Sequence, residues 1–292
     1  MKKIKTIIIG LGNIGLNYDY NLSDSFVLTH SRAIDRNSSF KILSGIDKDK
    51  KQLLKFSNRY QCPGFKSLSK FNQLNKNIIV DLVIISVLEN QHLIMIKQVF
   101  KYYKPKVILC EKPLGANIIE AKSIVSLCEK NQTKLFINYT RNTDHNFKYL
   151  VKFLKKKTEG VVRYRKSFIK NASHFLALFR AVLGKITLIK KNNLSNYTVH
   201  FKHGILIFKS EKKKDMQNTY ELENKDYKFA LRNKSFLVFN KKTKKIKVKN
   251  KIDAKNNEKV ILNIENYFKK KRNNLVNSNI ALELWNTMKR IK

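Results

Sequence analysis

Short apolar runs alternate with longer stretches of mixed polarity through the first half of the chain. The apolar residues in these runs are consecutive, and the runs are too short for helices, a pattern typical of strands buried on both faces of a sheet. The pattern predicts strands at 5–9, 40–46, 78–87, 107–110 and 134–138, and helices at 30–36, 48–60, 69–75, 92–103 and 118–130. This alternation indicates βαβ units and an α/β fold with a doubly wound parallel sheet.

The pattern changes after residue 142. A basic amphipathic helix is expected at 144–157, a strand at 161–166 and a helix at 175–183 that ends at Gly184. Short strands with brief turns are expected at 186–191, 197–202, 205–209, 219–222, 228–231 and 235–240, followed by closing helices at 260–271 and 276–289. Brief turns between strands favour a mainly antiparallel open sheet. We therefore predict two domains, 1–142 and 143–292, the second of the α+β class.

A glycine-rich turn follows the first expected strand. Gly10-Leu11-Gly12-Asn13-Ile14-Gly15 has the G-x-G-x-x-G spacing of dinucleotide-binding domains, directly after a strand as that pattern requires. Gly10 would permit the tight turn, Gly12 the approach of a pyrophosphate, and Gly15 the close packing of a helix whose N-terminal amides face the phosphates. The sequence therefore predicts a Rossmann domain.

Asp47 ends the second expected strand. An acidic side chain at that position accepts hydrogen bonds from the ribose hydroxyls of NAD and repels the 2′-phosphate of NADP. Asp47 follows Gly15 by 32 residues, where about 20 is usual, because residues 16–29 are interpreted as an inserted loop. NAD is the expected cofactor, with NADP as the alternative for the cofactor and a solvated strand-end carboxylate as the alternative for Asp47.

Glu111-Lys112-Pro113 ends the expected strand at 107–110. The carboxyl ends of parallel strands border the crevice in which open α/β sheets bind ligands. An ammonium group there can hydrogen-bond the oxygen on a carbon that gives up hydride, and can stabilise developing negative charge. The alternative is an ordinary strand exit with a solvated charge pair.

These features together resemble the glucose-fructose oxidoreductase / inositol dehydrogenase (Gfo/Idh/MocA) family over residues 4 to about 184. The resemblance is carried by the glycine turn, Asp47, His92, Glu111-Lys112-Pro113 and Asn138-Tyr139. It implies an NAD(P)-dependent oxidoreductase acting on CH–OH groups of a sugar or nucleotide sugar. In that family the lysine matching Lys112 orients the nicotinamide and holds the substrate hydroxyl.

The resemblance also implies a catalytic histidine. His174, in Asn171-Ala172-Ser173-His174, matches a family histidine that acts as acid/base, work suited to an imidazole; a capping or packing histidine is the alternative. Lys112 and His174 are the expected catalytic residues, and no metal is expected. The expected cofactor contacts are Gly10, Gly12, Asn13, Ile14, Gly15, Asp47, His92, Glu111, Pro113 and Asn138, and the expected substrate contacts are Lys112, Tyr139, Lys170, Asn171 and His174.

Two positions depart from the family pattern. Lys170 and Ala177 stand where many members carry aspartates, which favours either a branch associated with surface-polysaccharide biosynthesis or a non-catalytic dinucleotide-binding relative. The basic residues Arg163, Arg165 and Lys166 lie just upstream. If they face the crevice they would favour acidic or nucleotide-linked sugars over neutral ones; the alternative is that all are solvated.

The net charge of +40 adds little, because lysine is spread over the whole chain and only ten of the 61 basic residues are arginine. We interpret it as compositional drift rather than polyanion binding, since no nucleic-acid motif accompanies it. The lysine-rich run at 241–249 is expected to be a solvated turn and edge strand rather than an anion-binding patch.

The remaining features concern location and assembly. Three cysteines, Cys62, Cys110 and Cys128, suit a reducing cytoplasm as free thiols, and neither a signal peptide nor a membrane span is expected. The family resemblance implies a homo-oligomer built through the C-terminal sheet.

Overall fold

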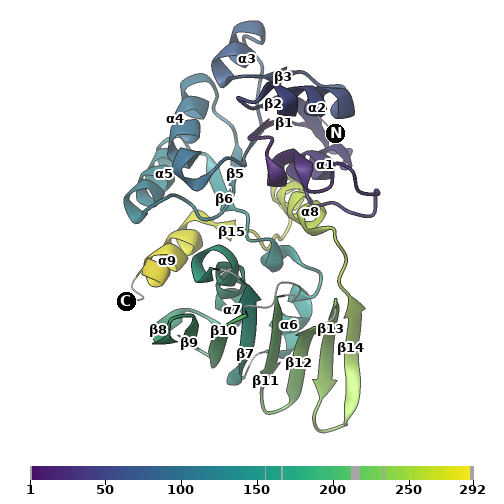
Figure 1. The fold of residues 1–292 in the computed structure, drawn as a ribbon, viewed down its shortest axis with the longest axis vertical. Coiled ribbons are helices and arrows are strands. Elements are labelled where there is room, and N and C mark those ends of the chain that lie inside the picture. Colours follow the sequence, from purple (N-terminus) through teal and green to yellow (C-terminus); the bar gives the residue numbers. More distant parts are fainter. Residues whose placement is uncertain (1, 155, 166, 212–217, 233, 290–292) are drawn as a thin grey trace. The chain divides into compact units, whose positions relative to one another are not determined.

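The computed structural model describes residues 2–154, 156–165, 167–211, 218–232 and 234–289 (Figure 1). The chain forms two compact units. Unit 1 comprises Met1–Thr143 and Ala254–Leu282, and unit 2 comprises Asp144–Asp253 and Glu283–Lys292. The predicted boundary after residue 142 lies one residue from the observed one, but the assignment of all of 143–292 to a second domain needs correction, because 254–282 belong to unit 1.

Unit 1 is built on a seven-stranded sheet of order β15-β6-β5-β4-β1-β2-β3. Its strands are β1 (Ile4–Ile9), β2 (Phe40–Ile46), β3 (Gly64–Phe65), β4 (Leu82–Ile85), β5 (Val107–Cys110), β6 (Lys134–Ile137) and β15 (Val276–Asn277). Every pair is parallel except β15 with β6. The strand order reverses between β1 and β4, which makes that edge the place where a doubly wound sheet binds ligands. The predicted parallel sheet is confirmed.

Helices cover both faces of this sheet. They are α1 (His30–Asp35), α2 (Lys50–Tyr60), α3 (Leu68–Leu74), α4 (His92–Tyr102), α5 (Ile118–Lys130) and α8 (Asn256–Phe268), with short turns η1 (Asn13–Asn17), η2 (Glu89–Gln91) and η3 (Thr140–Thr143). The helices α4 and α5 contact each other on one side of the sheet, and α1 contacts α8 on the other (Figure 1). Side chains of Thr29, Asp49, Ser67 and Asn117 cap helix N-termini, as their residue types favour.

The last part of the chain returns to unit 1. Val260, Ile261 and Ile264 of α8 are buried in one cluster with core residues of the sheet, such as Leu109 and Phe136. This apolar face explains why 254–282 pack with unit 1. The predicted helix at 276–289 is also corrected: β15 takes its first two residues, and α9 (Ser278–Lys289) follows.

Unit 2 holds an eight-stranded sheet of order β14-β13-β12-β11-β7-β10-β9-β8. Its strands are β7 (Thr158–Arg165), β8 (Ile186–Asn193), β9 (Asn196–Phe201), β10 (Gly204–Glu211), β11 (Thr219–Glu223), β12 (Tyr227–Arg232), β13 (Ser235–Asn240) and β14 (Lys245–Lys251). Only β7 and β10 pair in parallel among these described strands. The mainly antiparallel sheet is therefore confirmed, and the lysine-rich β14 is an edge strand exposed along most of its length.

Helix α7 (Ser173–Leu183) packs on one face of this sheet, where the rings of Phe175 and Phe179 meet Tyr220 edge to face. Helix α6 (Phe147–Phe153) is shorter than the predicted 144–157, because the chain turns toward β7 after Leu154. Lys155, within that prediction, and Lys166 lie outside the described residues. The opposite face carries a groove of about 590 Å³ lined by β7, β11, β12, β13 and β14. Over the described ranges, no helix is long and apolar enough to cross a membrane.

Candidate cofactor site at the strand ends of unit 1

The glycine turn after β1 owes its shape to two of its glycines. Gly10 has φ +94°, and a Cβ there would lie 2.7 Å from the carbonyl carbon of Ser86, while a Cβ on Gly15 would overlap the carbonyl oxygen of Gly10. Neither position has room for a side chain. Gly12 differs, since a Cβ on it would meet nothing within 4 Å. The exposed backbone at Gly12 therefore offers the surface that a pyrophosphate needs.

Protein contacts fix this turn from two sides. The Ser86 hydroxyl, at the end of β4, donates to the carbonyl oxygens of Gly10 at 2.7 Å and Ile9 at 3.1 Å. The amides of Leu16 and Asn17 donate to the Gly12 carbonyl at 2.8 and 3.1 Å, which forms the five-residue π-helix η1. This short turn leads into the expected inserted loop, and α1 begins after it at His30. Asn13 is exposed and Ile14 half-buried in this turn.

Asp47 lies against the glycine turn despite its distance in sequence. Its carboxylate accepts a hydrogen bond from the Leu11 amide at 2.6 Å and another from the Asp49 amide at 2.9 Å. The side chain is half-buried at the end of β2, beside the turn. A ribose bound over this edge would meet the carboxylate, so the residues present fit an adenine dinucleotide.

Glu111 is the centre of a second group of contacts. Its carboxylate oxygen Oε1 lies 2.8 Å from Nε2 of His30, and it accepts from Nδ2 of Asn138 at 2.6 Å. Glu111 and Asn138 follow the neighbouring parallel strands β5 and β6, which brings them to one edge. Burial alone would raise the pKa of Glu111, but the hydrogen bond and charge of His30, the Asn138 amide and the charge of Lys112 hold that pKa below its ordinary value.

Asn257 of α8 completes this group. Its Oδ1 accepts from Asn138 at 3.3 Å, and its Nδ2 donates to the Leu28 carbonyl at 2.5 Å. We call His30, Glu111, Asn138 and Asn257 the Glu111 cluster. Lys112 and Pro113, joined by a cis peptide, follow Glu111 directly. The cluster therefore braces the strand end that carries Lys112.

Two expected ligand contacts are instead buried. His92 has no exposed surface, and its ring nitrogens lie 3.1 Å from the Val87 carbonyl and 3.4 Å from the Leu114 carbonyl. Burial lowers the pKa of His92, which favours a neutral ring, and a neutral ring donates to only one of these two carbonyls at a time. Tyr139 is also buried, and burial raises the pKa of its phenol. Asn138 and Pro113, also expected cofactor contacts, are buried too, and contact of these residues with a ligand stays a prediction.

The remaining expected residues lie in unit 2. Lys170 and Asn171 belong to the π-helical turn η4 (Phe168–Ala172), which runs into α7, and His174 follows one turn after Lys170. Asn171 donates to the Arg165 carbonyl at 2.6 Å, which fixes the turn to the end of β7. Lys170 is exposed and His174 half-buried. The two expected catalytic residues thus come from different units, Lys112 from unit 1 and His174 from unit 2.

Three contributors to the site were not predicted: Ser86, His30 and Asn257. Ser86 lies inside the strand expected at 78–87, and it takes a strand-end position because the observed β4 ends at Ile85. His30 and Asn257 reach Glu111 and Asn138 from 81 and 119 residues away, and neither carries a local pattern. In the described part of the chain, no group of three or more His, Cys, Asp or Glu side chains is arranged to hold a metal ion.

The reversal of strand order, the glycine turn beside it and the strand-end carboxylate define a dinucleotide-binding Rossmann domain. Residues 4–139 match the Gfo/Idh/MocA family, described as an oxidoreductase family with an NAD-binding Rossmann fold. The match covers the Rossmann part of unit 1, just under half of the chain. No curated protein matches it in sequence.

Solved structures share the fold of both units. The UDP-N-acetylglucosamine 3-dehydrogenase GnnA from Acidithiobacillus ferrooxidans has 13% identity and a TM-score of 0.78, with 100% of this chain and 97% of that one covered. The WlbA dehydrogenase from Bordetella pertussis, in complex with NADH and UDP-GlcNAcA, has 12% identity and a TM-score of 0.73, covering 99% and 95%. An oxidoreductase from Agrobacterium radiobacter, in complex with NAD+, L-tartaric acid and magnesium, has 13% identity and a TM-score of 0.75, covering 99% and 95%.

Proposed function

We propose that the protein is an NAD-dependent dehydrogenase or reductase that transfers hydride between the nicotinamide and a secondary alcohol or ketone of a sugar or nucleotide sugar. The observation that carries this proposal is the arrangement of one sheet edge. The glycine turn and Glu111-Lys112-Pro113 follow strands β1 and β5, on either side of β4. A cofactor on the turn would extend along the edge on which Lys112 stands.

The roles of this chain's own residues follow from their chemistry. NAD, when bound, accepts or returns the hydride. Lys112 would hydrogen-bond the substrate oxygen and stabilise negative charge as it develops there. His174 would take the hydroxyl proton during oxidation and return it during reduction, since an imidazole exchanges protons near neutral pH. Asn171 and Lys170 would contact the substrate beside His174.

NAD rather than NADP is the proposed cofactor because of Asp47. Its carboxylate is fixed beside the turn by the Leu11 and Asp49 amides. A fixed negative charge repels a 2′-phosphate and accepts hydrogen bonds from a 2′-hydroxyl.

Acidic or nucleotide-linked sugars are the proposed substrates. The exposed ammonium of Lys170 precedes His174 by one turn and offers a charge for a phosphate or carboxylate. Arg163 contributes less than its charge suggests, because it lies 3.5 Å from a carboxylate oxygen of Glu211 and 3.9 Å from one of Glu221. A role in surface-polysaccharide synthesis in the cytoplasm is consistent with such a substrate.

The apolar centre of the groove on the unit 2 sheet supports assembly into a homo-oligomer. Its lining includes Val161, Leu237, Phe239 and Ile246. Ile246 is 58% exposed and lies beside the other apolar lining residues, and a contiguous apolar patch favours contact with another surface. We propose a second copy of the chain as that surface, which sedimentation would test.

A panel of substrates tests the proposed activity. NADH formation would be followed by ultraviolet absorbance with UDP-sugars, UDP-linked uronic acids, free glucose and free inositol, at two salt concentrations because exposed charges are screened. We expect turnover of a nucleotide-linked sugar above that of either neutral sugar. His174→Asn should lose most of this turnover together with its pH dependence near neutrality. Equal or faster turnover of glucose or inositol would overturn the proposed substrate class.

A non-catalytic dinucleotide-binding relative is the second candidate. The observation that favours it is Ala177, which replaces a family carboxylate and is fully buried among the apolar residues of α7. Tight NADH binding without turnover of any sugar in the panel would establish this alternative.

A further inference from the structure

His30 is a buried histidine that makes a side-chain contact with the motif carrying Lys112. It is the first residue of α1, it has no exposed surface, and its Nε2 lies 2.8 Å from Oε1 of Glu111. An ionised carboxylate only accepts hydrogen bonds, so Nε2 carries the proton in this contact. Nδ1 of the same ring is buried and has no hydrogen-bond partner among the residues that the structure describes. An apolar side chain would fill the same space without burying an unpaired polar atom. Packing alone therefore does not explain a histidine at position 30.

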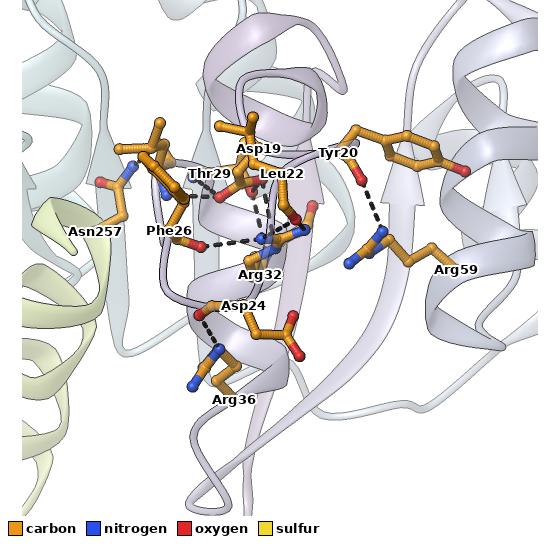
Figure 2. A network of polar contacts seen from close by, with 12 residues as sticks. Asp19, Tyr20, Leu22, Asp24, Phe26, Thr29, Arg32, Arg36, Arg59 and Asn257 are labelled. Atoms are coloured by element: carbon orange, nitrogen blue, oxygen red, sulfur yellow. Dashed lines mark hydrogen bonds and ion pairs between the residues drawn. The ribbon is translucent and has the colours of Figure 1, made fainter. Parts of the chain in front are cut away.

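The inserted loop that precedes His30 is held by a buried network (Figure 2). The carboxylate of Asp19 accepts from the amides of Leu28 at 2.6 Å and Thr29 at 2.9 Å, and from the Thr29 hydroxyl at 2.7 Å. Thr29 in turn caps α1 by accepting from the Arg32 amide. These bonds fix the residue directly before His30 and the axis of the helix that begins with it.

Arg32 fixes the rest of the loop. Its guanidinium donates to the carbonyls of Leu22, Ser23 and Phe26 at 3.0–3.2 Å, and its Nε lies 3.7 Å from Asp19 (Figure 2). Asp19 and Arg32 are both at least 98% buried. Burying opposite charges is costly unless their hydrogen-bonding groups are satisfied, and here most are. The loop is therefore a rigid support for His30.

We propose that His30 is a positioning residue for the hydride-transfer site: by donating to Glu111 it keeps that carboxylate charged and oriented, so that the side chain of Lys112, the next residue, stays charged and fixed at the strand end. This inference rests on the proposed function of Lys112. The inserted loop of residues 16–29 is then part of the active site, although it need not touch the substrate. Asn138, directly after β6, donates to the same carboxylate, and Asn257 of α8 accepts from Asn138.

Four variants separate positioning from packing. His30→Leu fills the space without a donor, and His30→Gln keeps an N–H of similar reach. Glu111→Gln removes the charge on which His30 acts, and the double variant His30→Leu/Glu111→Gln tests whether the two residues act together. His203→Leu is the matched control, since His203 is exposed on a turn of unit 2. Each variant would be checked for its thermal midpoint and for NADH affinity by fluorescence.

With the best substrate of the panel, His30→Leu should lower kcat by about 10- to 100-fold, as for other residues that orient a directly acting group, with KM and NADH affinity changed less than about threefold. His30→Gln should recover most of the rate. The double variant should be no slower than Glu111→Gln alone. Wild-type kcat in His30→Leu, or independent losses that multiply in the double variant, would overturn the proposal.

A second readout needs no turnover, so it separates this inference from the proposed function. Reaction of Lys112 with pyridoxal 5′-phosphate, trapped by borohydride and measured by peptide mass spectrometry, reports whether its amine is protonated and held. Loss of the neighbouring negative charge favours the reactive neutral amine. Labelling of Lys112 should therefore rise several-fold in His30→Leu and Glu111→Gln, and stay unchanged in His30→Gln and His203→Leu. Equal labelling in all variants would overturn the positioning role even if no substrate is found.

Discussion

The two parts of the cofactor site are held together by different means. The glycine turn is fixed mainly by backbone geometry, by absent side chains at Gly10 and Gly15 and by hydrogen bonds to carbonyls. The Glu111 cluster is assembled from side chains of four segments that are far apart in sequence. The difference teaches that the turn proposed to bind the cofactor phosphates depends on a local backbone shape, whereas the placement of Lys112, the proposed reactive lysine, depends on the completed unit.

Replacement of Lys112 tests the part of the site that is proposed to act on the substrate. Lys112→Met should lower kcat on the identified substrate by about 10³-fold, because it removes the donor proposed to stabilise charge on the substrate oxygen. NADH affinity, measured by fluorescence titration, should stay close to that of the wild type, since the glycine turn is unchanged. Turnover equal to the wild type would place the reactive group elsewhere.

A matched pair of substitutions tests the turn. Gly15→Ala should destabilise the protein by about 3 kcal/mol, because its Cβ would overlap the Gly10 carbonyl oxygen. Gly12→Ala introduces the same atom into open space, so its unfolding free energy should change by less than about 1 kcal/mol while NADH affinity falls. Urea unfolding and fluorescence titration measure both effects. Equal stability losses would show that the turn is not fixed in this way.

The hydrogen bonds of Glu265, which link α8 to the rest of unit 1, should make a pH-dependent contribution to the free energy of unfolding. Glu265 accepts from Nδ2 of Asn37 at 2.8 Å, from Oγ of Ser39 at 2.7 Å, and from Lys269. Burial alone would raise the pKa of Glu265, but these donors lower it to about 2. A folded-state pKa below the ordinary value of 4.5 stabilises the fold above about pH 4.5, and that contribution is lost as pH falls toward 2.

Glu265→Gln should therefore cost about 2 kcal/mol at neutral pH, and the difference from the wild type should shrink between pH 4.5 and 2. Chemical denaturation across this range measures it. Glu129→Gln is a suitable control, because Glu129 is an exposed residue of α5. A constant difference across the range would contradict the assigned hydrogen bonds.

The smallest expected effect concerns the choice of cofactor. Asp47→Asn removes the negative charge but keeps the oxygen that faces the Leu11 amide. The preference for NADH over NADPH should narrow by about tenfold, since repulsion of the 2′-phosphate is lost. Calorimetric titration with both cofactors measures the ratio. Preferred NADPH binding by the wild type would remove the role assigned to Asp47.

Sequence patterns predicted the features that depend on local backbone structure. They missed the contacts between segments that are far apart in the sequence. The strand at 107–110 and the helix at 118–130 were predicted to the residue, because burial on both faces and an asparagine cap leave local signals. Asp47 was predicted from the dinucleotide-binding pattern, and Asn138 from the family resemblance. The contacts of His30 and Asn257 have no such rule, because they depend on how an inserted loop and a distant helix pack. The return of α8 to unit 1 was missed for the same reason.

The return of residues 254–282 to unit 1 has a consequence for synthesis. On the ribosome the chain emerges from its N-terminus, so Asp144–Asp253 appear before the segment that covers the Leu109 and Phe136 side of the first sheet. Residues 1–143 of unit 1 therefore keep apolar surface exposed until residues 254–282 are synthesised, while most of unit 2 can already fold. A nascent chain stalled before residue 254 should therefore bind chaperones that recognise apolar surface, and release them once α8 has emerged.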